Sequence, residues 1–134
     1  MRTLKATIES LETGYSAYIE NLDGIAATGS TIDEIKNRLI DALDDYAETC
    51  KQLGCELPAE LEDDYRIVFT MDVKSLLSIY YGIFTKSGLE KLTGINQKQL
   101  WHYACGRSVP RRTQVLKIEN ALHRLGSELI SLEL

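Results

Sequence analysis

The sequence predicts an α+β fold in which a β-β-β-α-β module precedes an all-α bundle of helices. Near the N-terminus apolar and polar residues alternate as in half-buried strands, whereas farther along apolar residues recur at helical spacing. Charge divides the chain in a similar way. Residues 1–64 hold 15 acidic and 5 basic residues, a net charge of −10, and residues 65–134 hold 5 acidic and 10 basic residues, a net charge of +5. The division indicates two modules with different partners, unless it only reflects two unrelated solvated surfaces.

Three short strands are predicted at the start. Leu4, Ala6 and Ile8 alternate with polar residues within 3–11, so they should face a core. A turn at 12–14 leads to a second strand at 15–20, which completes a hairpin. A second turn at 21–24 leads to a third strand at 25–28.

A long helix should follow these strands. Thr31 and Glu34 form a capping box, in which each side chain satisfies a free backbone N–H of the first turn. Apolar residues at helical spacing continue to Leu53, and Gly54 is expected to end the helix. Residues 54–64 are predicted to form an acidic surface connection, and residues 65–70 a fourth strand.

The first module resembles the N-terminal domain of HicB antitoxins over roughly residues 3–70. The matching residues are Gly14, Tyr15, Gly24, Gly29, Thr31 and Glu34. The usual proline of the family's loop is absent, and Glu20 and Asn21 stand there. The resemblance implies a partial ribonuclease-H-like fold that binds a HicA toxin, a small basic RNA-cleaving protein. Because acidic surfaces attract basic partners, we expect toxin contacts at Tyr15, Tyr18, Asp41, Asp44 and Asp45.

An enzymatic role is disfavoured by the residues of the first strand. A ribonuclease-H-type site needs several carboxylates around two metal ions, one of them in the middle of that strand. The middle is Ala6-Thr7-Ile8, and Glu9 lies late on the outward face. The sequence also lacks a Gly-rich phosphate loop, a Ser/His/Asp constellation and a His-rich metal spacing. We therefore expect no catalytic residues, no metal site and no cofactor.

Cysteine usage and hydropathy indicate a cytoplasmic protein. No apolar run reaches the roughly 20 residues that cross a bilayer, and the N-terminus lacks the apolar core of a signal peptide. Cys50, Cys55 and Cys105 have no metal-ligand spacing, which favours reduced structural thiols. Cys50 and Cys55 lie five residues apart near a helix end and are expected to point in different directions.

Four helices are predicted in residues 71–134. The first runs from Val73 to about Tyr81 after the capping residue Asp72, the second spans 86–93, the third spans 97–105, and Pro110 opens the fourth. Gly94 and Gly106 should end the second and third helices. The predicted core residues are Val73, Leu76, Leu77, Tyr80, Phe84, Leu89, Leu92, Ile95, Leu100, Tyr103, Val115, Ile118, Leu122 and Leu125.

This module resembles the helix-turn-helix of the Cro/lambda-repressor family. The residues in register are Leu89, Gly94, Ile95, Leu100, Tyr103, Gly106 and Pro110. The resemblance implies DNA binding, the alternative being an inert helical bundle. Glu90 departs from the family's small residue and should loosen the packing of the second helix on the third.

The exposed side of the third helix carries hydrogen-bonding groups suited to base edges in the major groove. The expected base contacts are Asn96, Gln97, Lys98, Gln99, Trp101 and His102. The flanking cations expected to hold phosphates are Lys86, Arg107, Arg111 and Arg112. Trp101 has two interpretations, contact with a thymine methyl group or packing on the first helix.

These patterns together suggest an antitoxin of a type II toxin–antitoxin pair. Residues 1–70 would bind a HicA-like toxin, and residues 71–134 would bind operator DNA and repress the pair's own promoter. A two-fold operator would require a homodimer or a higher homo-oligomer. The alternative is a stand-alone repressor whose first module dimerises or senses a ligand. Residues 129–134 could be a short strand paired with 65–70, a fraying helix end or a dimer contact.

Overall fold

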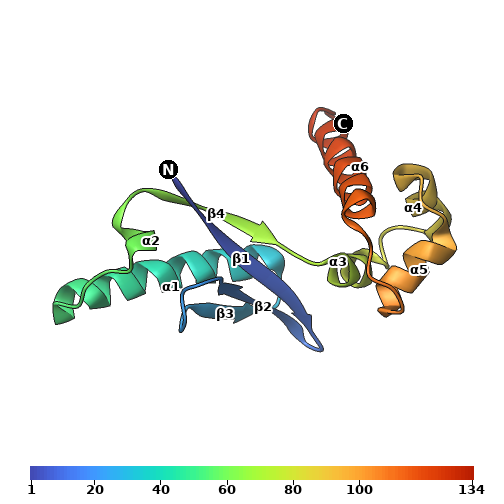
Figure 1. Ribbon diagram of the computed structural model, residues 1–134. Coiled ribbons are helices and arrows are strands. Elements are labelled where there is room, and N and C mark those ends of the chain that lie inside the picture. The colour runs from blue at the N-terminus through green and yellow to red at the C-terminus, as the bar shows by residue number, and fades with distance from the viewer. The chain divides into compact units, whose positions relative to one another are not determined.

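The computed structural model describes residues 1–134, which divide into two compact units, Met1–Met71 and Asp72–Leu134 (Figure 1). The protein is mixed α+β, with a four-stranded sheet and two helices in the first unit and four helices in the second. The division falls one residue from the predicted boundary after Thr70. None of the helices is both long and apolar enough to cross a membrane.

The first unit is a sheet with strand order β3-β2-β1-β4. Its elements in chain order are β1 (Arg2–Leu11), β2 (Gly14–Ile19), β3 (Ala26–Gly29), α1 (Ile32–Leu53), α2 (Ala59–Glu62) and β4 (Tyr65–Thr70). The pairs β1–β2 and β2–β3 are antiparallel, whereas β4 pairs with β1 in parallel. All four strands and the long helix occur where the alternation and the capping residues predict them.

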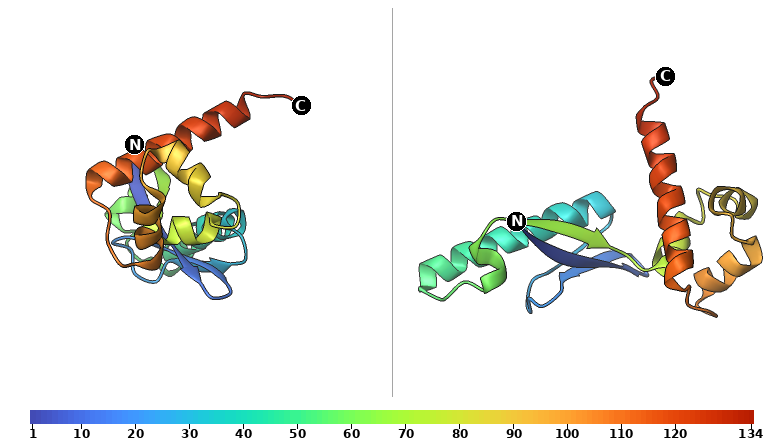
Figure 2. Two further views of the ribbon diagram at one scale, coloured as in Figure 1. Left: turned by 90° about the vertical axis from the view of Figure 1, so that its right-hand side faces the viewer. Right: turned by 45° about the horizontal axis from the view of Figure 1, so that its top comes forward.

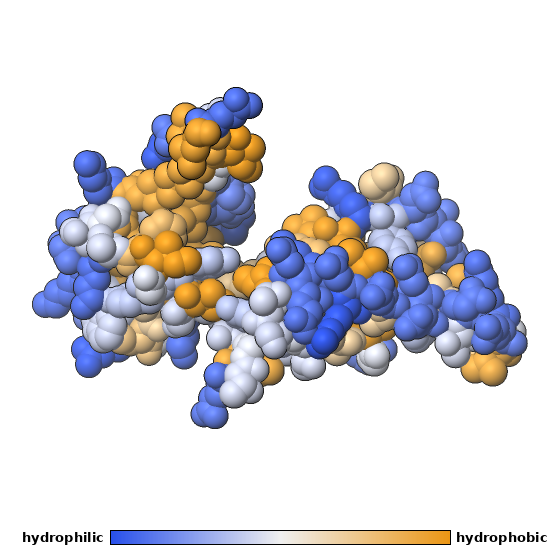
Figure 3. All heavy atoms as spheres, turned by 180° about the vertical axis from the view of Figure 1, so that it is seen from behind, coloured by the Kyte–Doolittle hydropathy of each residue, from blue (hydrophilic) through white to orange (hydrophobic).

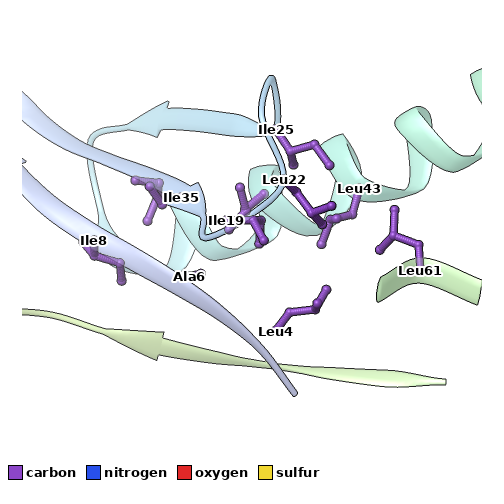
Figure 4. Packing of buried hydrophobic residues seen from close by; sticks show 11 residues of the cluster. Leu4, Ala6, Ile8, Ile19, Leu22, Ile25, Ile35, Leu43 and Leu61 are labelled. Atoms are coloured by element: carbon purple, nitrogen blue, oxygen red, sulfur yellow. The ribbon is translucent and has the colours of Figure 1, made fainter. Parts of the chain in front are cut away.

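Helix α1 covers one face of the sheet and closes the core of the first unit (Figure 1). Leu4, Ala6 and Ile8 of β1 point into this core and are nearly inaccessible, which confirms the predicted alternation. From α1, Ile35, Leu39 and Leu43 are the largest fully buried side chains. Figure 4 shows Leu43 among Leu4, Leu22, Ile25 and Leu61. The opposite face of the sheet has no helix of this unit over it.

The N-terminal cap of α1 forms, but only half of the predicted capping box is present. Thr31 Oγ1 accepts a hydrogen bond from the backbone N–H of Glu34 at 3.1 Å. The Glu34 carboxylate instead forms an ion pair with Arg38 at 2.8 Å. Arg38 also donates to the carbonyl oxygen of Thr28 at 2.8 Å, so this pair ties the first turns of α1 to β3.

Gly14 must be glycine because β2 starts against the end of β3. Its φ is +111°, in the left-handed region that favours glycine. A Cβ atom at this position would also collide with the carbonyl oxygen of Gly29, the residue that pairs with Tyr15. Gly14 therefore allows the backbones at the start of β2 and at Gly29, the end of β3, to approach each other closely.

The segment between α1 and β4 is not only a surface connection. Residues 59–62 form the short helix α2, and Leu61 packs into the core with 9% of its surface exposed. Arg2 donates to the carbonyl oxygen of Ala59 at 2.7 Å and holds α2 beside β1. Leu57 also packs against this core, so the acidic composition of the segment conceals two apolar contacts, and the prediction of a solvated connection is wrong at Leu57 and Leu61.

Replacing Leu39 by alanine should destabilise the first unit by about 2–5 kcal/mol, because the cavity left in a closed core cannot fully collapse. The neighbouring Ile40, which is 42% exposed on the same helix, provides a matched control. Ile40→Ala should change stability by less than about 0.5 kcal/mol. Urea unfolding followed by far-UV circular dichroism measures both losses. Equal losses would contradict this placement of the core.

The second unit contains α3 (Val73–Tyr80), α4 (Lys86–Thr93), α5 (Gln97–Cys105) and α6 (Arg112–Ile130). Asp72 caps α3, Gly94 ends α4 and Gly106 ends α5, as predicted. The buried core consists of Leu77, Leu89, Ile95, Leu100, Tyr103 and Ile118. Some details differ from prediction. Four expected core residues are only half-buried and lie outside this cluster, namely Tyr80, Leu92, Val115 and Leu125, whereas Thr93 is buried. Helix α6 starts two residues after Pro110.

Helix α6 continues past Gly126, a residue type that often ends a helix. Although Gly126 could end a helix and begin a separate terminal segment, α6 continues through it to Ile130, and residues 132–134 lie outside any helix or strand. The alternative of a terminal strand is therefore wrong. The C-terminal half of α6 extends beyond the other helices of its unit (Figure 2). Leu129 and Ile130 at the end of α6, and Leu132 after it, are exposed to solvent.

Candidate nucleic-acid interface and partner surface

The turn between α4 and α5 is fixed by polar groups on both sides. Gly94 adopts a φ of +73° and donates its N–H to the carbonyl oxygen of Glu90 at 2.8 Å. Thr93 Oγ1 donates to the carbonyl oxygen of Leu89 and accepts from the N–H of Ile95. With Ile95 buried at 3% exposure, the two helices are held in one relative orientation.

Two acceptors satisfy the free N–H groups at the start of α5. Asn96 Oδ1 accepts from the N–H of Lys98 at 2.8 Å, so this residue acts as the N-cap. Glu90 Oε1 accepts from the N–H of Gln97 at 3.0 Å. Glu90 of α4 is thus bonded to the first turn of α5, and its effect on the packing of the two helices stays a prediction. Its carboxylate supplies a bond that a smaller residue could not make.

Replacing Glu90 by alanine should destabilise the second unit by about 0.5–2 kcal/mol, the range for losing a helix cap. Glu90→Gln keeps an acceptor oxygen and should lose much less. Trp101 is the only tryptophan and lies in this unit, so its fluorescence follows the urea unfolding of this unit. If Glu90→Ala were instead more stable than the parent, the small residue typical of the Cro/lambda-repressor family would stabilise this position better than glutamate does.

Helix α5 presents a polar and aromatic face to solvent. Gln97 and Lys98 are exposed at its N-terminal end, and Trp101 is 41% exposed one turn later. Leu100 and Tyr103 face inward at 4% and 5% exposure. This face can offer amide and ammonium groups to base edges. The caps by Asn96 and Glu90 at the start of α5 fix the direction of the helix that carries these groups.

Gln99 is not part of this exposed face. Its Nε2 donates to Ser108 Oγ at 3.0 Å, and the residue is half-buried. It lines a shallow hollow of about 380 Å³ on the other side of α5, together with Tyr103, Ser108, Val109, Arg111 and Gln114. Gln99 therefore positions the segment after α5, and its amide is engaged within the protein.

Trp101 packs within its own unit, which is one of its two interpretations, and contact with a thymine methyl group stays a prediction. Its ring meets the ring of Tyr81, the residue after α3, edge to face with centroids 6.0 Å apart. Lys86 at the start of α4 holds its Nζ 4.8 Å from the Trp101 ring centroid and 5.9 Å from that of Tyr81. The structure thus brings an expected phosphate contact beside an expected base contact.

The remaining candidates lie around the C-terminal end of α5. Arg107, Arg111 and Arg112 are exposed, whereas His102 is half-buried and its carbonyl oxygen accepts from the Arg107 N–H at 2.9 Å. Sequence reasoning missed Lys74 of α3, whose side chain approaches the backbone at Gly106. No local pattern could have indicated Lys74, because 32 residues separate it from Gly106.

The five expected toxin contacts do not form one surface. Tyr15 packs against the core of the first unit, whereas Tyr18 is 41% exposed on the sheet face away from α1. Asp41, Asp44 and Asp45 are exposed on α1. Burial, together with the nearby Asp44 carboxylate, raises the pKa of Tyr65 above its usual value. The aspartates on α1 and Tyr18 on the open sheet face are thus separate candidate surfaces.

Comparisons with known proteins identify no relative. No family model matches the chain, and neither a curated protein nor a solved structure matches it.

Proposed function

We propose that this protein is the antitoxin of a type II toxin–antitoxin pair. Its first unit neutralises a HicA-like, mRNA-cleaving toxin, and its second unit binds operator DNA as a helix-turn-helix and represses the pair's own promoter. Both roles belong in the cytoplasm and need neither a catalytic residue nor a cofactor. The partial ribonuclease-H-like identity of the first unit is part of this proposal.

The observation that carries the proposal is the N-terminal end of α5. Exposed Gln97 and Lys98 project from a helix whose first turn is capped by Asn96 and Glu90. A glutamine amide can pair bidentately with adenine, and a lysine ammonium can reach O6 and N7 of guanine. The second unit has 9 basic and 5 acidic residues, a net charge of +4, which favours approach to phosphates.

The first unit has the opposite charge. Residues 1–71 hold 15 acidic and 6 basic residues, a net charge of −9, which repels nucleic acid and favours a basic protein partner. A HicA-like toxin is such a partner. The exposed aspartates on α1 are the surface that we propose for it.

We further propose that two copies associate through the end of α6. One recognition helix reads one half-site, so a two-fold operator needs a dimer. Leu122, Leu125 and Leu129 are spaced three and four residues apart, as in a helix-pairing seam. Leu122 packs on the core of its own unit, whereas Leu129 is 60% exposed. Figure 3 shows hydrophobic residues gathered over this end of α6, and a second copy supplies a matching stripe.

The antitoxin role can be tested by growth of cells that express the small basic reading frame next to this gene. Expression of that frame alone should arrest growth, and co-expression with this chain should restore it. A chain carrying Asp41→Asn, Asp44→Asn and Asp45→Asn should rescue less well, whereas Glu12→Gln in the hairpin turn should not matter. If no arrest occurs, or this chain does not relieve it, the protein is better described as a stand-alone repressor.

A further inference from the structure

Two cysteines are joined by a backbone hydrogen bond at the C-terminal end of α1. Gly54 adopts the left-handed conformation with a φ of +70°, and its N–H donates to the carbonyl oxygen of Lys51 at 3.3 Å. The next N–H, of Cys55, returns to the carbonyl oxygen of Cys50 at 2.9 Å. This pair of bonds is a Schellman motif, which brings the backbones of its first and last residues together and is frequently accompanied by a contact between their side chains. In this protein those residues are Cys50 and Cys55.

The surroundings of Tyr46 agree with this arrangement. The Cys50 thiol beside the Tyr46 hydroxyl raises the pKa of that hydroxyl, and Cys55 adds to the effect. Both thiols thus act on one hydroxyl at this end of α1, with Cys50 having the larger effect. Cys50 is 8% exposed, whereas Cys55 is open to solvent.

We propose that Cys50 and Cys55 form a dithiol modification site that a low-molecular-weight disulfide, such as glutathione disulfide, oxidises to an intramolecular disulfide. The proposal does not depend on the antitoxin role. It rests on the helix-end geometry and on one exposed thiol beside one buried thiol.

The reaction proceeds by two thiol–disulfide exchanges. The Cys55 thiolate attacks one sulfur of glutathione disulfide, breaks its S–S bond and releases the first glutathione thiolate. The Cys50 thiolate then attacks Cys55 Sγ in the mixed disulfide and releases the second. The two protons lost by the protein thiols are taken up by the two glutathione thiolates. Two protein thiols are oxidised, and one glutathione disulfide is reduced.

The ring closed by this disulfide is short, so it would restrict the unfolded chain less than a disulfide that closes a long loop. Its effect would be local, since it fastens the start of the segment that leads to α2 onto the last turn of α1. A reversible modification therefore fits the site better than a permanent structural bridge.

The test uses the full chain with Cys105→Ser, so that only the two cysteines of the site remain. Incubation with glutathione disulfide should remove both alkylatable thiols and leave no bound glutathione, as measured by intact mass after alkylation. The matched variant with Cys50→Ser as well keeps the attacking Cys55 but cannot close the ring, so the glutathione that Cys55 takes up should stay attached. A stable glutathione adduct on the parent, or two thiols that stay free, would overturn the proposal.

A second measurement separates fold geometry from sequence proximity. In a glutathione redox buffer the ratio of disulfide to dithiol should be at least about tenfold higher in the native chain than in urea, because the Schellman motif holds the thiols together. An equal or lower ratio in the native chain would mean that the helix end keeps the two sulfur atoms apart.

Discussion

A chain carrying Lys98→Ala should bind its operator with a free energy weaker by about 1–3 kcal/mol in each half-site. In a two-fold dimer the substitution acts in both half-sites, so the total loss of binding free energy should be roughly twice that range. The physical reason is that the ammonium group proposed to contact a base edge is replaced by a methyl group that cannot donate. Gln97→Ala should weaken binding by a similar amount, because it removes the amide proposed to pair with a base.

Fluorescence anisotropy with DNA from upstream of the gene measures this loss, and Lys117→Ala provides the control. Lys117 is an exposed lysine on α6, so its removal changes the net charge equally but touches no proposed base contact. The Lys98 variant should also lose discrimination among operators that differ at one base position. Equal behaviour of the Lys98 and Lys117 variants would mean that α5 is not the recognition helix.

The elements that sequence reasoning placed well are those with a local cause. The alternation of Leu4, Ala6 and Ile8 needs only the two-residue period of a strand. The ends of α4 and α5 need only glycines at Gly94 and Gly106 that can adopt positive φ. Such rules act within a few residues, so they can be applied before any tertiary contact is known.

The features that sequence reasoning missed depend on contacts between segments that are separated in the sequence. Gln99 is a good base-reading residue by type, but Ser108 engages its amide after the chain has turned back. Glu90 violates a packing preference at its own position and yet caps the following helix through Gln97. Residue type and spacing cannot distinguish a free donor from one already bonded within the fold.

Gly126 illustrates the same limit for a helix end. A glycine near the end of an apolar stripe is a normal stop, but α6 continues through Gly126 to Ile130, and Gly126 is not among the glycines with a positive φ. The continued helix carries Leu129 and Ile130, which are exposed.

Replacing Leu129 by glutamate should therefore convert the proposed dimer to a monomer, because two carboxylates would be buried against each other in the seam. Operator affinity should fall by about 10²–10⁴-fold, since the second half-site would no longer be bound at a high effective concentration. Light scattering measures the first effect and anisotropy the second. Ser127→Glu, which adds the same charge two residues earlier on another side of α6, should change neither.

The two measurements together distinguish the parts of the proposal. If Leu129→Glu stays dimeric, the copies associate through another surface, and the exposed end of α6 needs a different explanation. If it becomes monomeric and keeps its affinity, one half-site suffices and the two-fold operator is wrong. Only joint loss of the dimer and of affinity, with Ser127→Glu unchanged, would connect the exposed leucines to recognition of DNA by α5.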